Sequence, residues 1–189
     1  MSKLNVSSAE TVKAFLDEVK TQTDRGAAII AASVLDELFK RVILERLIVI
    51  GGERSDALFN KIGAPLASFS AKIELAFALG IISNDARLAA HPVRDVRNKF
   101  AHRIEPLSFD HSEVSQIILT RASKNAKALA GSTRDKFLAI FHSLAMVLYG
   151  TLAADIRIKS LEATHAEHFV AMMKHILSVS AGQNSSKES

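Results

Sequence analysis

Proton transfer and phosphate binding are both within reach of the side chains between Arg97 and His102. A histidine titrates near neutral pH and can act as general base or general acid, whereas an arginine is always cationic and matches the geometry of a phosphate. In metal-independent RNA cleavage, His102 would move the 2′-hydroxyl proton. Arg97 would stabilise the charge that develops on phosphorus, and Asn98 would orient one of the two groups.

The surrounding sequence predicts a helix, which fixes how these side chains can meet. Residues four apart share a helix face, so Asn98 and His102 align, whereas Arg97 lies about 140° around the helix from His102. A single histidine would have to act as both the general acid and the general base. A homodimer that brings two such helix faces together would supply one histidine for each role. In the alternative interpretation, Arg97 pairs with Asp95 or Glu105, and His102 caps the carbonyls at its own helix end.

A second candidate site for nucleic acid is the basic stretch 114–134, which contains no acidic residue. Its cations are Arg121, Lys124, Lys127 and Arg134, and the first three recur every three residues along a predicted helix. These side chains could contact phosphates without sequence preference. A solvated helix face is the simpler explanation of these residues, and base stacking is unsupported because Phe137 is the only aromatic residue near them.

The sequence contains little that indicates a metal or cofactor site. Glu162, His165 and His168 show the Glu-x-x-His step of di-iron helical bundles, but the sequence has no second step of this kind. It also lacks a phosphate-binding glycine loop and a nucleophile elbow. Because cysteine is absent, disulfides and thiolate sites are excluded. We therefore expect neither a metal nor a cofactor.

The composition predicts an all-α protein. Of 189 residues, 48% are hydrophobic, while 8 Gly and 3 Pro leave few turn signals. The net charge of +4 permits contact with nucleic acid without implying it. The N-terminal residues lack the layout of a signal peptide, which favours the cytoplasm. Residues 137–154 are uncharged, but their polar and glycine content predicts a buried helix or a subunit interface, not a membrane span.

The hydrophobic periodicity predicts a single bundle of six or seven helices, formed by residues 1–181, with a disordered tail at 182–189. Ser7, Asp24, Ser68 or Ser70, Ser83 or Asn84, and Ser132 are the expected helix starts. The bundle helices are expected over residues 8–22, 24–50, 68–79, 84–102, 112–130, 132–158 and 164–179, with a short additional helix around residues 56–60. Pro92 would either kink its helix or sit in the first turn of a separate one. We find no helix-turn-helix pair with a basic second helix.

Two resemblances to known families bear on function. Arg97-Asn98-x-x-Ala101-His102 resembles the Arg-polar-x3-His signature of the HEPN superfamily, which implies a dimeric, metal-independent endoribonuclease that is often a toxin. Residues 20–160 resemble the mannitol operon repressor family of bacterial proteins, most recognisably over residues 63–82, GAPLASFSAKIELAFALGII. That resemblance implies an all-α transcriptional regulator that lacks a DNA-reading module and acts through a protein partner. We expect such a regulator, with the endoribonuclease as the first alternative and a purely structural interaction module as the second.

Overall fold

The computed structural model describes residues 9–47, 50–121 and 131–153. These residues form α-helices and one π-helical segment, which confirms the all-α class. They all belong to one compact unit, Met1–Ile156. The second unit, Arg157–Ser189, lies outside the described residues. The extent of the predicted domain and the tail at 182–189 therefore remain predictions, as does the helix at 164–179.

The first two helices are α1, Ala9–Thr21, and α2, Asp24–Arg46. The Thr23 side chain caps α2 by accepting a hydrogen bond from the Gly26 amide, so the predicted cap, Asp24, is instead the first helical residue. Helix α2 also ends earlier than the predicted Ile50, because Leu47 is extended. The β-branched run that follows disfavours continuation of the helix.

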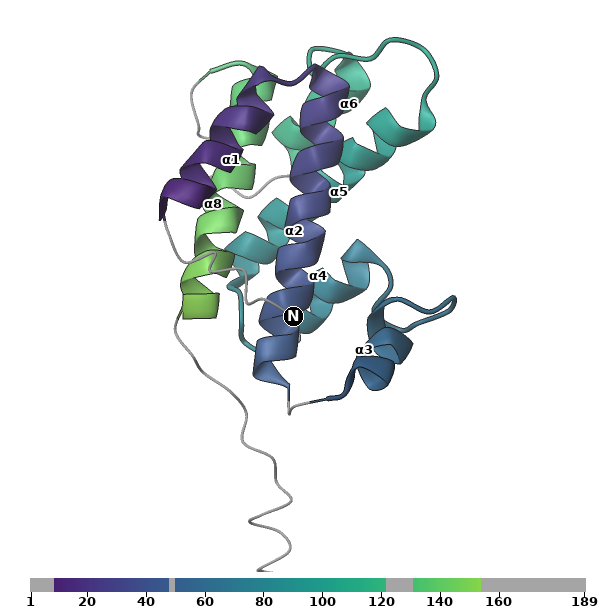
Figure 1. Cartoon of the computed structure of the whole chain (residues 1–189). Helices are drawn as coiled ribbons and strands as arrows, with labels where there is room; N and C mark the ends of the chain where they lie inside the picture. Colours follow the sequence, from purple (N-terminus) through teal and green to yellow (C-terminus); the bar gives the residue numbers. More distant parts are fainter. Residues whose placement is uncertain (1–8, 48–49, 122–130, 154–189) are drawn as a thin grey trace, which may run out of the picture. The chain divides into compact units, whose positions relative to one another are not determined.

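Helix α2 is the central helix of this unit, and it contacts α1, α4, α5 and α8 (Figure 1). Its buried face is built mainly of small residues at its start and larger ones further along, from Ala27 to Ile43. The small residues allow neighbouring helices to approach closely, while the larger ones fill the core. This helix therefore holds the others in position.

A short helix, α3, spans Gly52–Phe59, and α4 spans Phe69–Ala78. Gly51 is the N-cap of α3, and Gly52 is its first residue, so this helix begins earlier than the predicted residue 56. Of the two predicted starts, Ser68 is the one that caps α4. Gly80, with φ of 66°, ends that region in the left-handed conformation, where a side chain would be strained.

Helix α5, Asn84–His102, carries the candidate catalytic residues and is capped by Ser83. It runs as one helix through the buried Pro92, so the separate-segment alternative was wrong. Arg25 of α2 donates hydrogen bonds to the carbonyls of Arg103 and Glu105 at 2.8 and 3.0 Å. These bonds fix the chain just after the end of α5, next to His102.

The chain then forms α6, Ser112–Gln116, which passes directly into the π-helical segment η1, Ile117–Arg121. The predicted helix from 112 to 130 is thus not α-helical throughout, and residues 122–130 lie outside the described residues. A π-turn is wider than an α-turn and is often found at functional sites. The Thr120 hydroxyl donates to the Gln116 carbonyl at 2.6 Å within it.

The last described helix is α8, Thr133–Ala153. Ser132 and Asp135 exchange hydrogen bonds at its start, which confirms the predicted restart of the chain. One face of its uncharged stretch is buried, whereas Met146 and Val147 are exposed, and the Phe137 ring lies tilted against Phe109 with centroids 4.9 Å apart. Phe109 also contacts Phe100 of α5, at 5.2 Å. Among the described residues, no helix is long and apolar enough to cross a membrane.

Candidate functional site

The second half of α5 lies between two grooves. The first, which we call the His102 groove, has a volume of about 680 Å³ and lies between α5 and the α6–η1 segment. Its lining residues are Asp95, Asn98, Lys99, His102, Arg103, Glu113, Gln116, Ile117 and Thr120. Asn98 and His102 therefore share a groove, as their four-residue spacing predicts. His102 is the last residue of α5 and is exposed.

The second groove, which we call the Arg97 groove, has a volume of about 460 Å³ and lies where α2, the start of α4 and α5 meet. Its lining residues are Ala32, Ser33, Asp36, Ala67, Ser68, Phe69, Ser70, Arg94, Arg97 and Asn98. Arg97 thus lines a different groove from His102, and Asn98 lines both. The helix geometry that places Arg97 about 140° from His102 explains this separation.

Hydrogen bonds hold the arginines in these positions. Arg97 Nη1 donates to Asn98 Oδ1 at 3.0 Å. Arg94 forms an ion pair with Asp95 at 2.5 Å and donates to the Ser70 hydroxyl at 2.7 Å, which connects α5 to the first turn of α4. Of the pairings proposed for Arg97, Glu105 lies near Arg103 instead, at 3.7 Å.

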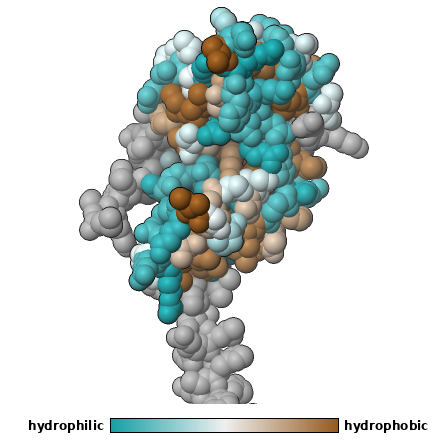
Figure 2. Space-filling model, turned by 90° about the vertical axis from the view of Figure 1, so that its right-hand side faces the viewer, coloured by the Kyte–Doolittle hydropathy of each residue, from teal (hydrophilic) through white to brown (hydrophobic). Residues whose placement is uncertain are grey.

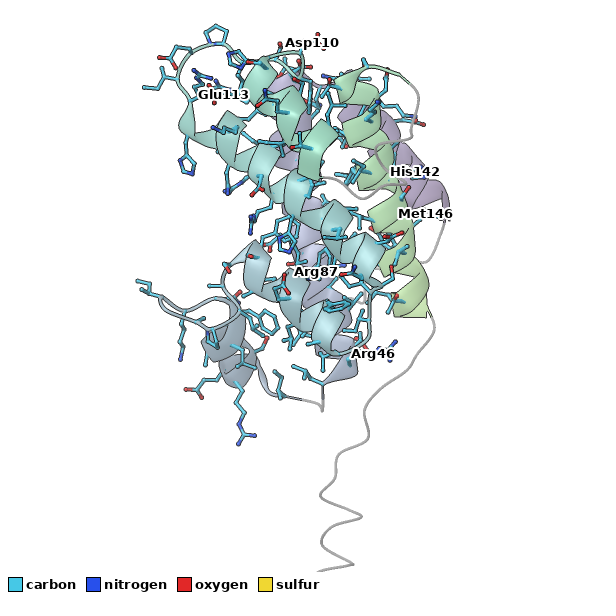
Figure 3. The ribbon with its side chains drawn as sticks, turned by 180° about the vertical axis from the view of Figure 1, so that it is seen from behind. Arg46, Arg87, Asp110, Glu113, His142 and Met146 are labelled. Atoms are coloured by element: carbon cyan, nitrogen blue, oxygen red, sulfur yellow. The ribbon has the colours of Figure 1, made fainter. Side chains whose placement is uncertain are left out.

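The His102 groove is electrically mixed. Glu113 of α6 accepts a hydrogen bond from Lys99 at 2.8 Å and one from Arg103 at 3.3 Å, and Figure 3 shows its place beside the end of α5. The hydrogen bond from Lys99, together with the charges of Lys99 and Arg103, lowers the pKa of the Glu113 carboxyl from its ordinary value. Glu113 is therefore ionised at neutral pH. Its negative charge offsets the positive charges of Lys99 and Arg103, which would otherwise attract a phosphate backbone.

The four cations predicted to bind phosphate do not form one described cluster in the structure. Arg121 ends η1, and Lys124 and Lys127 lie outside the described residues. Arg134 forms an ion pair with Asp24, donates to the carbonyls of Lys20 and Gln22 at 3.0 and 2.6 Å, and lies over the Phe109 ring. Its guanidinium thus joins the start of α8 to the junction of α1 and α2. Phosphate binding by this set stays a prediction.

Sequence reasoning missed the polar residues that build the Arg97 groove. Lys72 is only 4% exposed, and its Nζ contacts both carboxylate oxygens of Asp36, at 2.7 and 2.8 Å. A signal was available, because Lys72 lies on the apolar face of α4, beside the buried Ile73 and Ala76. The predicted Glu162, His165 and His168 lie outside the described residues. Within the described part of the chain, no group of three acidic or histidine side chains could hold a metal.

Two apolar side chains in loops are the most exposed of the large hydrophobic residues in the described part of the chain. Ile104, which follows α5, and Ile62, in the loop between α3 and α4, are 95% and 108% exposed. Figure 1 places these two loops on the right, which is the side that faces the viewer in Figure 2. That face mixes hydrophilic and hydrophobic residues, and two separate, strongly hydrophobic side chains protrude from it (Figure 2).

Comparison with known proteins gives a structural relative but no sequence relative. No family model and no curated protein matches the sequence. A solved structure described as the X-ray structure of the MtlR–HPr complex from Escherichia coli matches with a TM-score of 0.53 and 15% sequence identity. The match covers 76% of this chain and 97% of the other. At this identity the match concerns the fold alone, so the helical fold of this chain is similar to that of the matched chain in the MtlR–HPr complex.

Proposed function

We propose that this chain is a cytoplasmic bacterial regulatory protein that acts by binding a partner protein. The observation that carries the proposal is the fold match, which extends over 97% of a chain solved in complex with a second protein. The sequence resemblance to the mannitol operon repressor family, over residues 20–160, leads to the same expectation. By analogy, the first partner to test is HPr.

The chemistry of the His102 groove supports a protein as the ligand. Glu113 and Asp95 contribute carboxylates beside Lys99 and Arg103, so the groove offers both signs of charge within a short distance. Ile104 adds an almost fully exposed apolar side chain directly after Arg103. Protein interfaces combine such an apolar contact with a polar, charge-complementary rim, whereas a nucleic-acid site concentrates positive charge.

A titration calorimetry experiment tests this proposal. The purified full-length chain is titrated with HPr encoded by the same genome, in wild-type form and as the Ile104→Asp variant. We expect saturable binding of the wild type and a loss of at least about tenfold in affinity for the variant, because a buried charge would replace an apolar contact. Ile62→Asp is the matched control, since Ile62 is equally exposed in a different loop. Absence of binding by the wild-type chain would contradict the choice of partner.

The endoribonuclease remains the second candidate, and one observation favours it. Asn98 and His102 line the same groove, and His102 is accessible to a substrate. Because Arg97 lines the other groove, the predicted pairing of Arg97 with His102 needs a second copy of the chain, although Arg103 lines the His102 groove within one chain. Homodimerisation is therefore part of this candidate.

Incubation with RNA in the presence of a chelator separates the two functions. The nuclease predicts fragments with 2′,3′-cyclic phosphate ends, and loss of cleavage in both His102→Ala and Arg97→Ala. A mixture of these two inactive variants should recover part of the activity if the groups act across a dimer. Intact RNA under conditions where the chain binds its protein partner would exclude the nuclease.

A further inference from the structure

We propose that the Arg97 groove binds the phosphate group of a small phosphate monoester. This inference does not depend on the proposed protein partner. It rests on which hydrogen-bonding atoms of the groove are already used by the protein and which are left for a ligand.

Three side chains that line the groove already accept hydrogen bonds from donors of the protein. Both carboxylate oxygens of Asp36 accept from the buried Lys72, at 2.7 and 2.8 Å. Asn98 Oδ1 accepts from Arg97, and because arginine can only donate, this contact also fixes the orientation of the amide. The hydroxyl of Ser70 accepts from Arg94 at 2.7 Å.

The same contacts leave donors for a ligand. The hydroxyl hydrogen of Ser70 and the Nδ2 hydrogens of Asn98 are not used in the bonds just described. The hydroxyl of Ser68 likewise accepts from the Ala71 amide, at 3.1 Å, and keeps its hydrogen. Arg97 uses one of the five N–H donors of its guanidinium in the bond to Asn98. A ligand that matches this set must be rich in acceptors.

The net charge of the Arg97 groove favours an anionic ligand. Lys72 neutralises Asp36, and Asp95 faces Arg94, whereas the hydrogen bond of Arg97 goes to a neutral amide. Arg97 therefore gives the groove a net positive charge. The donors come from α4 and from α5, so they surround a bound group from two sides. A phosphate monoester has three terminal oxygens that accept hydrogen bonds and match a guanidinium.

The size of the site favours a small molecule over a nucleic acid. A volume of about 460 Å³ lies within the range of small-molecule sites. The neighbouring His102 groove brings the carboxylates of Asp95 and Glu113 to the other side of Asn98. A polyanion that continued from the Arg97 groove along α5 would meet these negative charges, whereas a single phosphate would not.

Inorganic phosphate is the first probe, added to the ¹⁵N-labelled full-length chain at constant ionic strength. We expect saturable shifts of the Ser33, Ser70 and Asn98 amide signals. Arg97→Gln should weaken binding about tenfold, as expected for loss of a charge-assisted contact, and Ser70→Ala about threefold. Lys99→Gln is the matched control, because it removes the same charge from α5 but lines the other groove, and it should change the affinity less than about twofold.

Three further compounds identify the source of the phosphate. Glucose 6-phosphate should bind at least as tightly as inorganic phosphate, and glucose should not bind. The diester uridylyl-uridine should bind more weakly than either phosphate, and tighter binding of this diester would overturn the proposal in favour of RNA. The proposal also fails if the wild-type signals do not shift, or if Lys99→Gln weakens binding as much as Arg97→Gln. Because the readout is phosphate binding, failure here leaves the HPr titration unaffected.

Discussion

Arg97 and Asn98, neighbours in sequence, are joined by a hydrogen bond from Arg97 Nη1 to Asn98 Oδ1, 3.0 Å long. Asn98 lines both grooves, whereas Arg97 lines the groove that does not include His102. The residues that suggest one catalytic site in the sequence are thus divided between two sites within one chain. A function that uses Arg97 and His102 on the same phosphate requires a second chain, whereas protein binding does not.

The buried ion pair between Lys72 and Asp36 predicts unequal effects of its two single substitutions. Asp36→Asn should cost about 3 kcal/mol of the free energy of unfolding, because it leaves the Lys72 ammonium, which is 4% exposed, without its charge partner. Lys72→Met should cost only about 1 kcal/mol, since it removes the buried charge and keeps an apolar chain. Urea denaturation measures both, and equal losses would contradict this interpretation of the pair.

Arg134 should matter for stability. Arg134→Gln removes the ion pair with Asp24 and the bonds to two carbonyls, so we expect a loss of about 2 kcal/mol in the free energy of unfolding. Lys136→Gln, two residues further along α8, is the matched control and should change stability by less than about 0.5 kcal/mol. Thermal and urea unfolding of the two variants provide the measurement. A neutral Arg134→Gln that lost nucleic-acid binding would instead favour the phosphate-contact prediction.

Glu74 predicts a pH dependence of stability. Hydrogen bonds from Arg87, at 3.0 Å, and from His91, at 2.8 Å, lower the pKa of the Glu74 carboxyl from its ordinary value. A lowered pKa in the folded state stabilises the fold above the unfolded-state value, and this contribution is lost as the pH falls through the lower folded-state value. Because the side chain is 46% exposed, the contribution is only about 0.5 kcal/mol.

The measurement compares wild type with Glu74→Gln by urea denaturation between pH 7 and pH 3. The difference in stability should be present at pH 7 and should shrink below about pH 4, where the unfolded-state carboxyl becomes protonated. A difference that grew on acidification would mean that the carboxyl is stabilised in its protonated form. Arg87 belongs to α5 (Figure 3) and Glu74 to α4, so their hydrogen bond joins these two helices.

The helices were predictable largely because local signals specify them. Ser68, Ser83 and the Ser132–Asp135 pair mark helix starts, and each caps its helix in the structure. Pro92 was ambiguous because local rules disfavour proline inside a helix, whereas tertiary packing buries it within a continuous α5. The π-helical turn at Ile117 has no comparable signature in the sequence.

The candidate site was predictable only where one helix determines it. Asn98 and His102 share a groove because both belong to α5, and their spacing alone predicts this. Glu113, Ser70 and Asp36 come from other elements, so their approach to α5 depends on how the helices pack. Arg25 was also missed, although its contacts with the Arg103 and Glu105 carbonyls fix the chain next to His102. Contacts between residues so far apart in the sequence leave no local pattern.

Mapping of the partner-binding surface on the full-length chain is the most direct test of the proposed function. Amide signals of the ¹⁵N-labelled chain are recorded while the proposed partner protein is added. We predict that the largest changes occur at Lys99, His102 and Ile104, and at Glu113 and Thr120 across the groove. Changes confined to α8, or no changes at saturating partner, would contradict a protein-binding function of the His102 groove.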